Sequence, residues 1–120
     1  MNFLKSHLII FNLFLFISVC AQQMHFKTTC TNKECVINAF TQDALHAGYL
    51  KLSGCRITYL NVFPQFEKTG FAKALLEQAR LQAAIHDCKE VSLYSLKSLL
   101  TYYQRNGFTC DQHKNCTHPI

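Results

Sequence analysis

The spacing of apolar residues changes once along this chain, at Gly70, and this change constrains the fold more than any other feature. Before it, three short runs rich in β-branched and aromatic residues are separated by turn residues, which predicts strands over 35–41, 44–52 and 56–62. After it, apolar residues recur at helical spacing, which predicts an amphipathic helix over 71–86. The predicted buried stripe of this helix is Ala72, Leu75, Leu76, Ala79 and Ala83.

Two of the predicted strands carry further detail. Gly48, inside the second run, indicates a bulge or a close approach of another backbone. The third run alternates, so two opposite faces are expected. One face carries Ile57, Tyr59 and Asn61, and the other carries Thr58, Leu60 and Val62.

The rest of the chain predicts a strand over 90–94, a short helix over 98–105 and a strand over 108–110. Gly107 is placed to end the short helix. The predicted order is β-β-β-α-β-α-β. A strand-helix-strand connection within one sheet is almost always a right-handed crossover between parallel strands. The expected class is therefore α+β: a mixed, mostly antiparallel sheet with one parallel pair and two covering helices.

The N-terminal segment, residues 1–21, has the layout of a secretory signal peptide. Lys5 precedes an apolar stretch over 8–19, and Val19-Cys20-Ala21 permits cleavage before Gln22. The apolar stretch is short for a spanning helix. The alternatives are a membrane anchor formed by 8–19, a wrongly chosen start codon, or a buried helix. The predicted organisation is a signal peptide over 1–21, an extension over 22–34, a domain over 35–110 and a tail over 111–120, in a secreted or periplasmic protein.

Composition excludes two classes of chain. Apolar residues make up 49% and charged residues 16%, which is the balance of a folded chain and not of a disordered one. Lysine and arginine number 12 against 7 acidic residues, but the basic residues are dispersed. Since no basic stripe with interleaved aromatic residues exists, nucleic-acid binding is not expected. The sequence does not set an oligomeric state.

Six cysteines follow the predicted cleavage site: Cys30, Cys35, Cys55, Cys88, Cys110 and Cys116. An even number in an exported chain permits disulfides. Cys30 with Cys35 would tie the N-terminal edge of the domain, and Cys110 with Cys116 would tie its C-terminal tail. Cys55 and Cys88 are instead expected to be buried, reduced thiols. The tail also contains four potential zinc ligands, Cys110, His113, Cys116 and His118. Their spacing is tighter than that of a zinc finger, so no metal site is expected.

The join between strand 56–62 and helix 71–86 is a candidate anion site. The first turn of a helix offers unpaired backbone N–H groups, and Lys68 and Lys73 add positive charge beside Gly70. Many strand-loop-helix joins look similar, so this feature alone does not define a function.

Two stretches with ordered spacing resemble the GNAT acyltransferase superfamily. The first is ITYLNVFPQFEKTGFAKALLEQA over 57–79, and the second is YYQRNGF over 102–108. The first corresponds to a strand of the family that ends in valine and is followed by a proline, a glycine-containing loop and a helix with Ala-Leu-Leu. The second corresponds to a later pair of an aromatic residue and a tyrosine, which is followed after three residues by Gly-Phe. Two positions depart from the family pattern. Glu67 stands where the family has an arginine or glutamine, and Lys68 stands where the family often has a glycine. No counterpart of the family's N-terminal strand and first two helices is recognised before residue 35.

The resemblance implies a site for acetyl-CoA or a related acyl-CoA. The strand before the loop would present backbone groups to the pantetheine, and loop and helix amides would hold the pyrophosphate. Tyr103 matches the tyrosine that protonates the departing thiolate, although it could equally be a packed core residue. The implied cofactor-binding residues are Leu60, Asn61, Val62, Lys68, Thr69, Gly70, Phe71, Ala72 and Lys73.

The implied function is transfer of an acyl group, most simply acetyl, from acetyl-CoA to an amine on a small molecule or a protein. The alternative is an exported, non-catalytic binding protein with the same fold, because a fold does not fix a function.

Overall fold

The computed structural model describes residues 24–120, so the predicted signal peptide lies outside the described residues. Seven strands form one sheet, in the order β1-β2-β3-β4-β5-β7-β6. The strands are β1 His25–Cys30, β2 Glu34–Phe40, β3 His46–Ser53, β4 Arg56–Val62, β5 Glu90–Tyr94, β6 Thr109–Cys110 and β7 Asn115–Pro119. The helices are α2 Phe71–Ile85 and α3 Leu100–Arg105, with short 3₁₀ turns η1 Pro64–Phe66 and η2 Lys97–Leu99. Between residues 24 and 120, no helix is both long and apolar enough to cross a bilayer.

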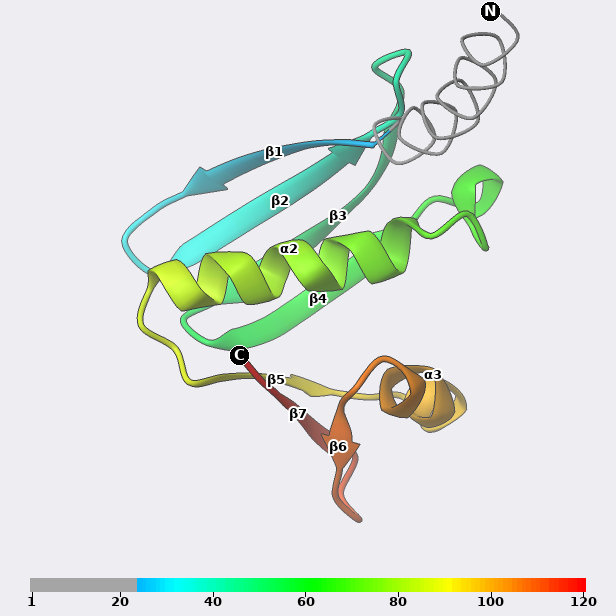
Figure 1. Ribbon diagram of the computed structural model, residues 1–120. Helices are drawn as coiled ribbons and strands as arrows, with labels where there is room; N and C mark the ends of the chain where they lie inside the picture. Colours follow the sequence, from blue (N-terminus) through cyan, green and yellow to red (C-terminus); the bar gives the residue numbers. More distant parts are fainter. Residues whose placement is uncertain (1–23) are drawn as a thin grey trace, which may run out of the picture.

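The predicted fold class is confirmed. β4 and β5 are parallel neighbours joined by the crossover helix α2, and the other strand pairs in the described chain are antiparallel. In Figure 1, α2 lies over β2, β3 and β4, while β5, β7, β6 and α3 form the other end of the molecule.

Two strands were not predicted. β1 lies within the predicted extension over 22–34, and β7 lies within the predicted tail over 111–120. The predicted element order, which began at residue 35 and ended at residue 110, therefore lacked one strand at each end. β1 is an edge strand with five of its six residues exposed, so it shows no apolar alternation. β7 contains one buried residue, Cys116, and polar neighbours.

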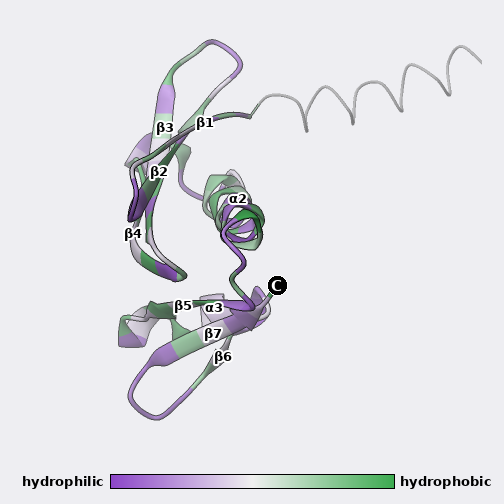
Figure 2. Cartoon of the chain, turned by 90° about the vertical axis from the view of Figure 1, so that its left-hand side faces the viewer, coloured by the Kyte–Doolittle hydropathy of each residue, from purple (hydrophilic) through white to green (hydrophobic). Residues whose placement is uncertain are grey.

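The core lies between α2 and the sheet face that it covers, as the view along the helix shows (Figure 2). Four residues of the predicted stripe are buried, and Phe71 joins them. Ala72 is half-buried instead, because it faces a hollow in the surface at the start of the helix. Small alanines at 79 and 83 let the helix lie close to β2–β5, where it packs.

A β-bulge in β4 changes the predicted faces of this strand. Lys51 pairs with Tyr59 and Leu52 pairs with Ile57, so Thr58 is an extra residue on β4. Beyond the bulge the alternation is reversed. Leu60 and Val62 pack against the core on the side of buried Ile57, whereas Tyr59 is 48% exposed. The predicted grouping of Ile57 with Tyr59 and Asn61 was wrong, because a strict period of two contains no bulge.

Gly48 allows β3 to approach the end of β4, as predicted. A side-chain carbon at this position would collide with the backbone of Asn61 and Val62. The close approach fixes the end of β4, where the chain enters the loop before α2.

Three disulfides are present. Cys30–Cys35 and Cys110–Cys116 each join directly paired residues of neighbouring strands. Cys55–Cys88 joins the turn before β4 to the segment after α2, which corrects the expectation of reduced thiols. The predicted burial was also wrong, because Cys55 is exposed and Cys88 is half-buried.

Candidate functional site

A hollow lies where β4 and β5 separate. The two strands pair at Arg56 with Ser92 and at Ile57 with Leu93, and the ladder ends there, next to the bulge at Thr58. We call this hollow of about 320 Å³ the strand cleft. Its walls are Ile57, Thr58, Tyr59, Leu60, Leu93, Tyr94, Leu96, Leu99 and Tyr103.

A second hollow of about 460 Å³, which we call the loop cradle, lies at the start of α2. The end of β4, the following loop, the first turn of α2 and one side of α3 form its walls. These residues are Val62, Phe66, Glu67, Lys68, Gly70, Phe71, Ala72, Lys73, Tyr102, Arg105 and Asn106.

The first turn of α2 is built to face an anion. Its N-cap is Gly70, which has no side chain to accept hydrogen bonds from the free amides, and the turn contains no acidic residue. Helices usually place carboxylates at this positive end of the dipole, yet here Lys73 lines the hollow. The amides of 71–73 therefore remain available to a ligand.

Backbone geometry in the loop explains one departure from the family pattern. Lys68 has a φ of 62° and Gly70 a φ of 92°, both in the left-handed region. Glycine adopts that region at little cost, whereas a residue with a side chain is strained there by about 1–2 kcal/mol. The family's frequent glycine at position 68 fits this conformation, and this chain keeps the conformation with a lysine.

The charge of the loop cradle is positive. Lys68, Lys73 and Arg105 line it together with a single carboxylate, Glu67. Glu67 is exposed, so water screens its charge. The basic residues and the helix dipole together favour a phosphate group over a cation.

Tyr103 lies in the wall of the strand cleft, with 8% of its surface exposed. Its ring packs edge-on against Phe108 and Tyr102, with centroids 5.7 and 5.5 Å away. No residue in 24–120 forms a hydrogen bond with the Tyr103 hydroxyl, and the hydroxyl oxygen is not fully buried. The hydroxyl is therefore accessible from the strand cleft. Burial, and to a smaller extent the nearby Tyr102, raises the pKa of Tyr103 above its ordinary value of 10.0. The phenol therefore stays protonated at neutral and mildly basic pH.

The other predicted site residues divide into three groups. Leu60 lines the strand cleft, and Val62, Lys68, Gly70, Phe71, Ala72 and Lys73 line the loop cradle. Thr69 lines neither hollow, and its hydroxyl donates to the Phe66 carbonyl within the loop. Asn61 lines neither hollow and pairs with Tyr49 of β3, on the sheet face away from α2.

Four residues of the loop cradle were missed by sequence reasoning: Phe66, Tyr102, Arg105 and Asn106. Phe66 belongs to η1, and the other three come from α3 and its C-cap, where the Asn106 side-chain amide donates to the Tyr102 carbonyl at 2.8 Å. Tyr102 and Arg105 lie one helical turn apart, so they share a face. That spacing was visible in the sequence, but the contact of this face with the loop is a tertiary feature.

The two hollows share two walls. β4 contributes Leu60 to the strand cleft and Val62 to the loop cradle, and α3 contributes Tyr103 to the first and Tyr102 to the second. An extended ligand with a phosphorylated head and a slender apolar arm matches this pair of hollows. The protonated phenol lies in the wall of the hollow that would hold the arm.

Residues 15–118 match the family model described as an acetyltransferase (GNAT) domain. No curated protein matches the chain in sequence.

Several solved structures share the fold. A GCN5-related N-acetyltransferase from Rhodopseudomonas palustris superposes with a TM-score of 0.67 at 14% identity, covering 72% of this chain and 62% of that one. PaiA N-acetyltransferase from Thermoplasma acidophilum, in complex with coenzyme A, gives 0.65 at 19% identity, with coverage of 73% and 62%. Tetrahymena GCN5 gives 0.64 at 11%, with 75% and 70%. This chain spans less than two thirds of the length of the first two proteins. The extensive match to the family model and the shared fold lead to one conclusion: the chain belongs to the GNAT acetyltransferase family.

Proposed function

We propose that this protein transfers an acetyl group from acetyl-CoA to an amine. The observation that carries the proposal is that the two hollows take walls from the same two elements, β4 and α3. A basic hollow at the start of α2 and a mostly apolar cleft with a protonated phenol thus lie along neighbouring stretches of β4 and α3.

The loop cradle would hold the pyrophosphate of the donor. The amides of 71–73 would donate to phosphate oxygens, and Lys68, Lys73 and Arg105 would neutralise their charge. The missing carboxylate in the first helical turn supports this role, because an acid there would compete with the ligand.

The strand cleft would hold the pantetheine arm and the thioester. After Ile57, one edge of β4 no longer pairs with β5, so its N–H and C=O groups on that edge face the cleft. One of these N–H groups could stabilise the negative charge that develops on the thioester oxygen.

In the transfer step, the amine nitrogen attacks the thioester carbon, a C–N bond forms and the C–S bond breaks. Tyr103 would donate its proton to the departing sulfur, which leaves as the thiol of coenzyme A. The proton released by the amine nitrogen would pass to water, and water would return a proton to the Tyr103 phenolate. The raised pKa of Tyr103 keeps the donor protonated before the step. The acceptor is a small-molecule or protein amine.

We also propose that residues 1–21 act as a cleaved signal, so that the protein works outside the cytosol. Three disulfides in the described chain support this placement, because such bonds persist in oxidising compartments. N-terminal sequencing of the expressed protein tests the cleavage: a start at Gln22 supports it, and a retained Met1 contradicts it.

The test of the chemistry is release of coenzyme A thiol from acetyl-CoA with a panel of small-molecule and peptide amines. Tyr103→Phe is expected to lower kcat by about 10²- to 10⁴-fold with little change in KM for acetyl-CoA, since general acid catalysis contributes about that much. Tyr102→Phe is the matched control, because it removes the neighbouring hydroxyl from the loop cradle and should keep most of kcat. Full activity of Tyr103→Phe would remove the acid role. Binding of acetyl-CoA without turnover of any amine would favour the non-catalytic alternative.

A further inference from the structure

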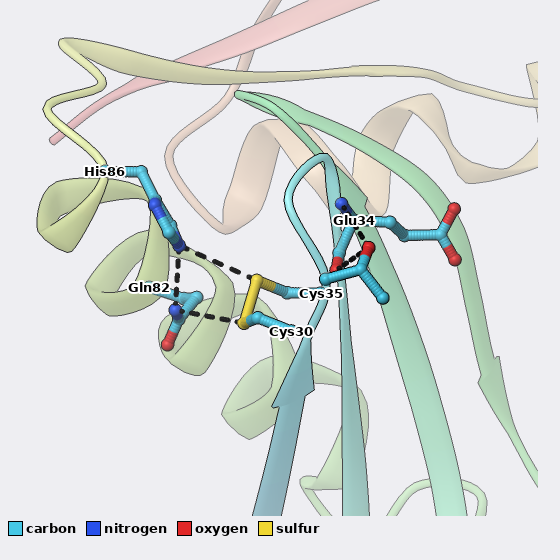
Figure 3. The surroundings of a disulfide bond; sticks show 6 residues. Cys30, Glu34, Cys35, Gln82 and His86 are labelled. Atoms are coloured by element: carbon cyan, nitrogen blue, oxygen red, sulfur yellow. Dashed lines mark hydrogen bonds between the residues drawn. A yellow bond between two sulfur atoms is a disulfide. The ribbon is translucent and has the colours of Figure 1, made fainter.

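At the far end of α2 from the loop cradle, a second cluster of reactive side chains meets the β1–β2 hairpin (Figure 3). Cys30 ends β1, and Cys35 lies directly opposite it on β2. His86, the C-cap of α2, places its Nε2 atom 3.7 Å from Cys35 Sγ. The two sulfurs and Nε2 all lie within 4.8 Å of one another.

We propose that this cluster binds zinc once the Cys30–Cys35 disulfide is reduced, so that the redox state of the hairpin controls metal binding. The site is independent of acyl transfer, because none of its three ligands lines the strand cleft or the loop cradle.

The distances suit a tetrahedral ion. With Zn–S bonds of about 2.3 Å and Zn–N bonds of about 2.0–2.1 Å, the sulfur-to-nitrogen edge of the tetrahedron is about 3.6 Å. The separation of Cys35 Sγ from His86 Nε2, 3.7 Å, already matches that edge. The sulfur-to-sulfur edge is about 3.8 Å. The two thiolates, which belong to opposed residues, would move apart to that distance after reduction.

The group that now faces these ligand atoms is a hydrogen-bond donor. The side-chain amide nitrogen of Gln82, one turn before His86, lies 3.4 Å from Cys30 Sγ and 3.1 Å from His86 Nε2. The Gln82 amide thus lies against one sulfur and one ring nitrogen of the cluster, so two of the three ligand atoms converge on the same point.

The site has room for a fourth ligand. Cys35 is buried, whereas Cys30 and His86 are exposed. Beside them lies a hollow of about 440 Å³, lined by the hairpin turn, by Cys35 and by His86. Water can complete the coordination from this side, which gives two sulfurs, one nitrogen and one oxygen.

A dithiol reductant supplies two electrons and two protons, the S–S bond breaks, and the dithiol becomes a disulfide while Cys30 and Cys35 become thiols. Zinc then displaces both thiol protons and forms two Zn–S bonds and one Zn–N bond. The oxidised pair offers no thiolate, so the disulfide form does not bind the ion.

Cobalt(II) is the probe, because its thiolate complexes absorb light. The full chain is reduced with a phosphine, the phosphine is removed under nitrogen, and the protein is titrated with Co²⁺. Circular dichroism shows whether the chain stays folded. We expect one equivalent to bind with a thiolate-to-cobalt absorption band, and zinc to displace it. The oxidised chain should show no band. A reduced chain that binds no ion, folded or unfolded, overturns the proposal.

Two further measurements locate the ion. His86→Ala should weaken binding by at least about tenfold, since even outer-shell changes cost 10- to 100-fold. The matched control is His113→Ala, which removes an exposed histidine near the other cross-strand pair, Cys110–Cys116. Bound zinc should also protect Cys30 and Cys35 from alkylation. Unchanged binding in His86→Ala, or protection of Cys110 and Cys116 instead, would refute the site.

Discussion

The Cys55–Cys88 disulfide should contribute more to stability than either of the other two. It ties the turn before β4 to the segment after α2, so the loop that it closes contains β4, the segment before α2 and the whole of α2. Cys55 is exposed and Cys88 is half-buried, so replacing both with alanine leaves little cavity. The loss should therefore come mainly from the freedom that the unfolded chain regains.

The magnitude follows from the length of the closed loop. A sequence separation of 33 corresponds to about 4 kcal/mol of chain entropy at 25 °C. The separation of 5 in Cys30–Cys35 corresponds to about 2 kcal/mol. For a domain of this size, 1 kcal/mol shifts Tm by about 4–8 °C, so the Cys55→Ala/Cys88→Ala variant should melt about 15–30 °C lower.

Thermal and urea denaturation of the oxidised proteins measure this difference, with Cys30→Ala/Cys35→Ala as the control. The control should lose about half as much stability. An equal or larger loss in the control, or a loss below about 1 kcal/mol in the Cys55→Ala/Cys88→Ala variant, would refute the reasoning from loop length.

Two further predictions concern the loop cradle and the tail. Gly70→Arg should abolish coenzyme A binding in calorimetry, whereas Gly54→Arg should keep it. Both positions have a positive φ, so both variants carry a similar backbone strain of about 1–2 kcal/mol. Equal losses of binding in the two variants would contradict the site. The backbone N–H groups of Asn115 and His113 donate to Asp111 and lower the pKa of its carboxyl below 3.8. This stabilisation is present above pH 3.8 and is lost as the pH falls through the folded-state pKa, so Asp111→Asn should flatten the decline of the urea midpoint between about pH 4 and 2. If the urea midpoint of Asp111→Asn falls with decreasing pH as steeply as that of the unmodified protein, the stabilising role of the Asp111 carboxylate is contradicted.

The elements around the core were predictable because their apolar periods are regular. β4 and β5 begin and end at the predicted residues, and α2 ends one residue early. β1 and β7 were missed because mostly polar edge and tail strands carry no alternation. The bulge at Thr58 reversed the alternation of β4. It arises from the pairing of β4 with β3, so the sequence of β4 alone does not reveal it.

The candidate site was partly predictable for the same reason. The loop and the start of α2 follow each other in sequence, so their contribution to the loop cradle could be read from Gly70 and its neighbours. The contribution of α3 depends on how this helix packs beside the loop. The Cys55–Cys88 bond and the approach of His86 to the hairpin also depend on packing, because their partners lie 33 and 51 residues apart.

We propose that the amides after Pro64 and the separated edge of β4 hold a nucleotide thioester. Amide chemical shifts recorded during a titration with coenzyme A would locate this binding residue by residue. Saturable shifts are expected in 60–62 and 68–73, with smaller ones in α3 beside Tyr102. Shifts gathered elsewhere on the sheet, or none at millimolar coenzyme A, would contradict it.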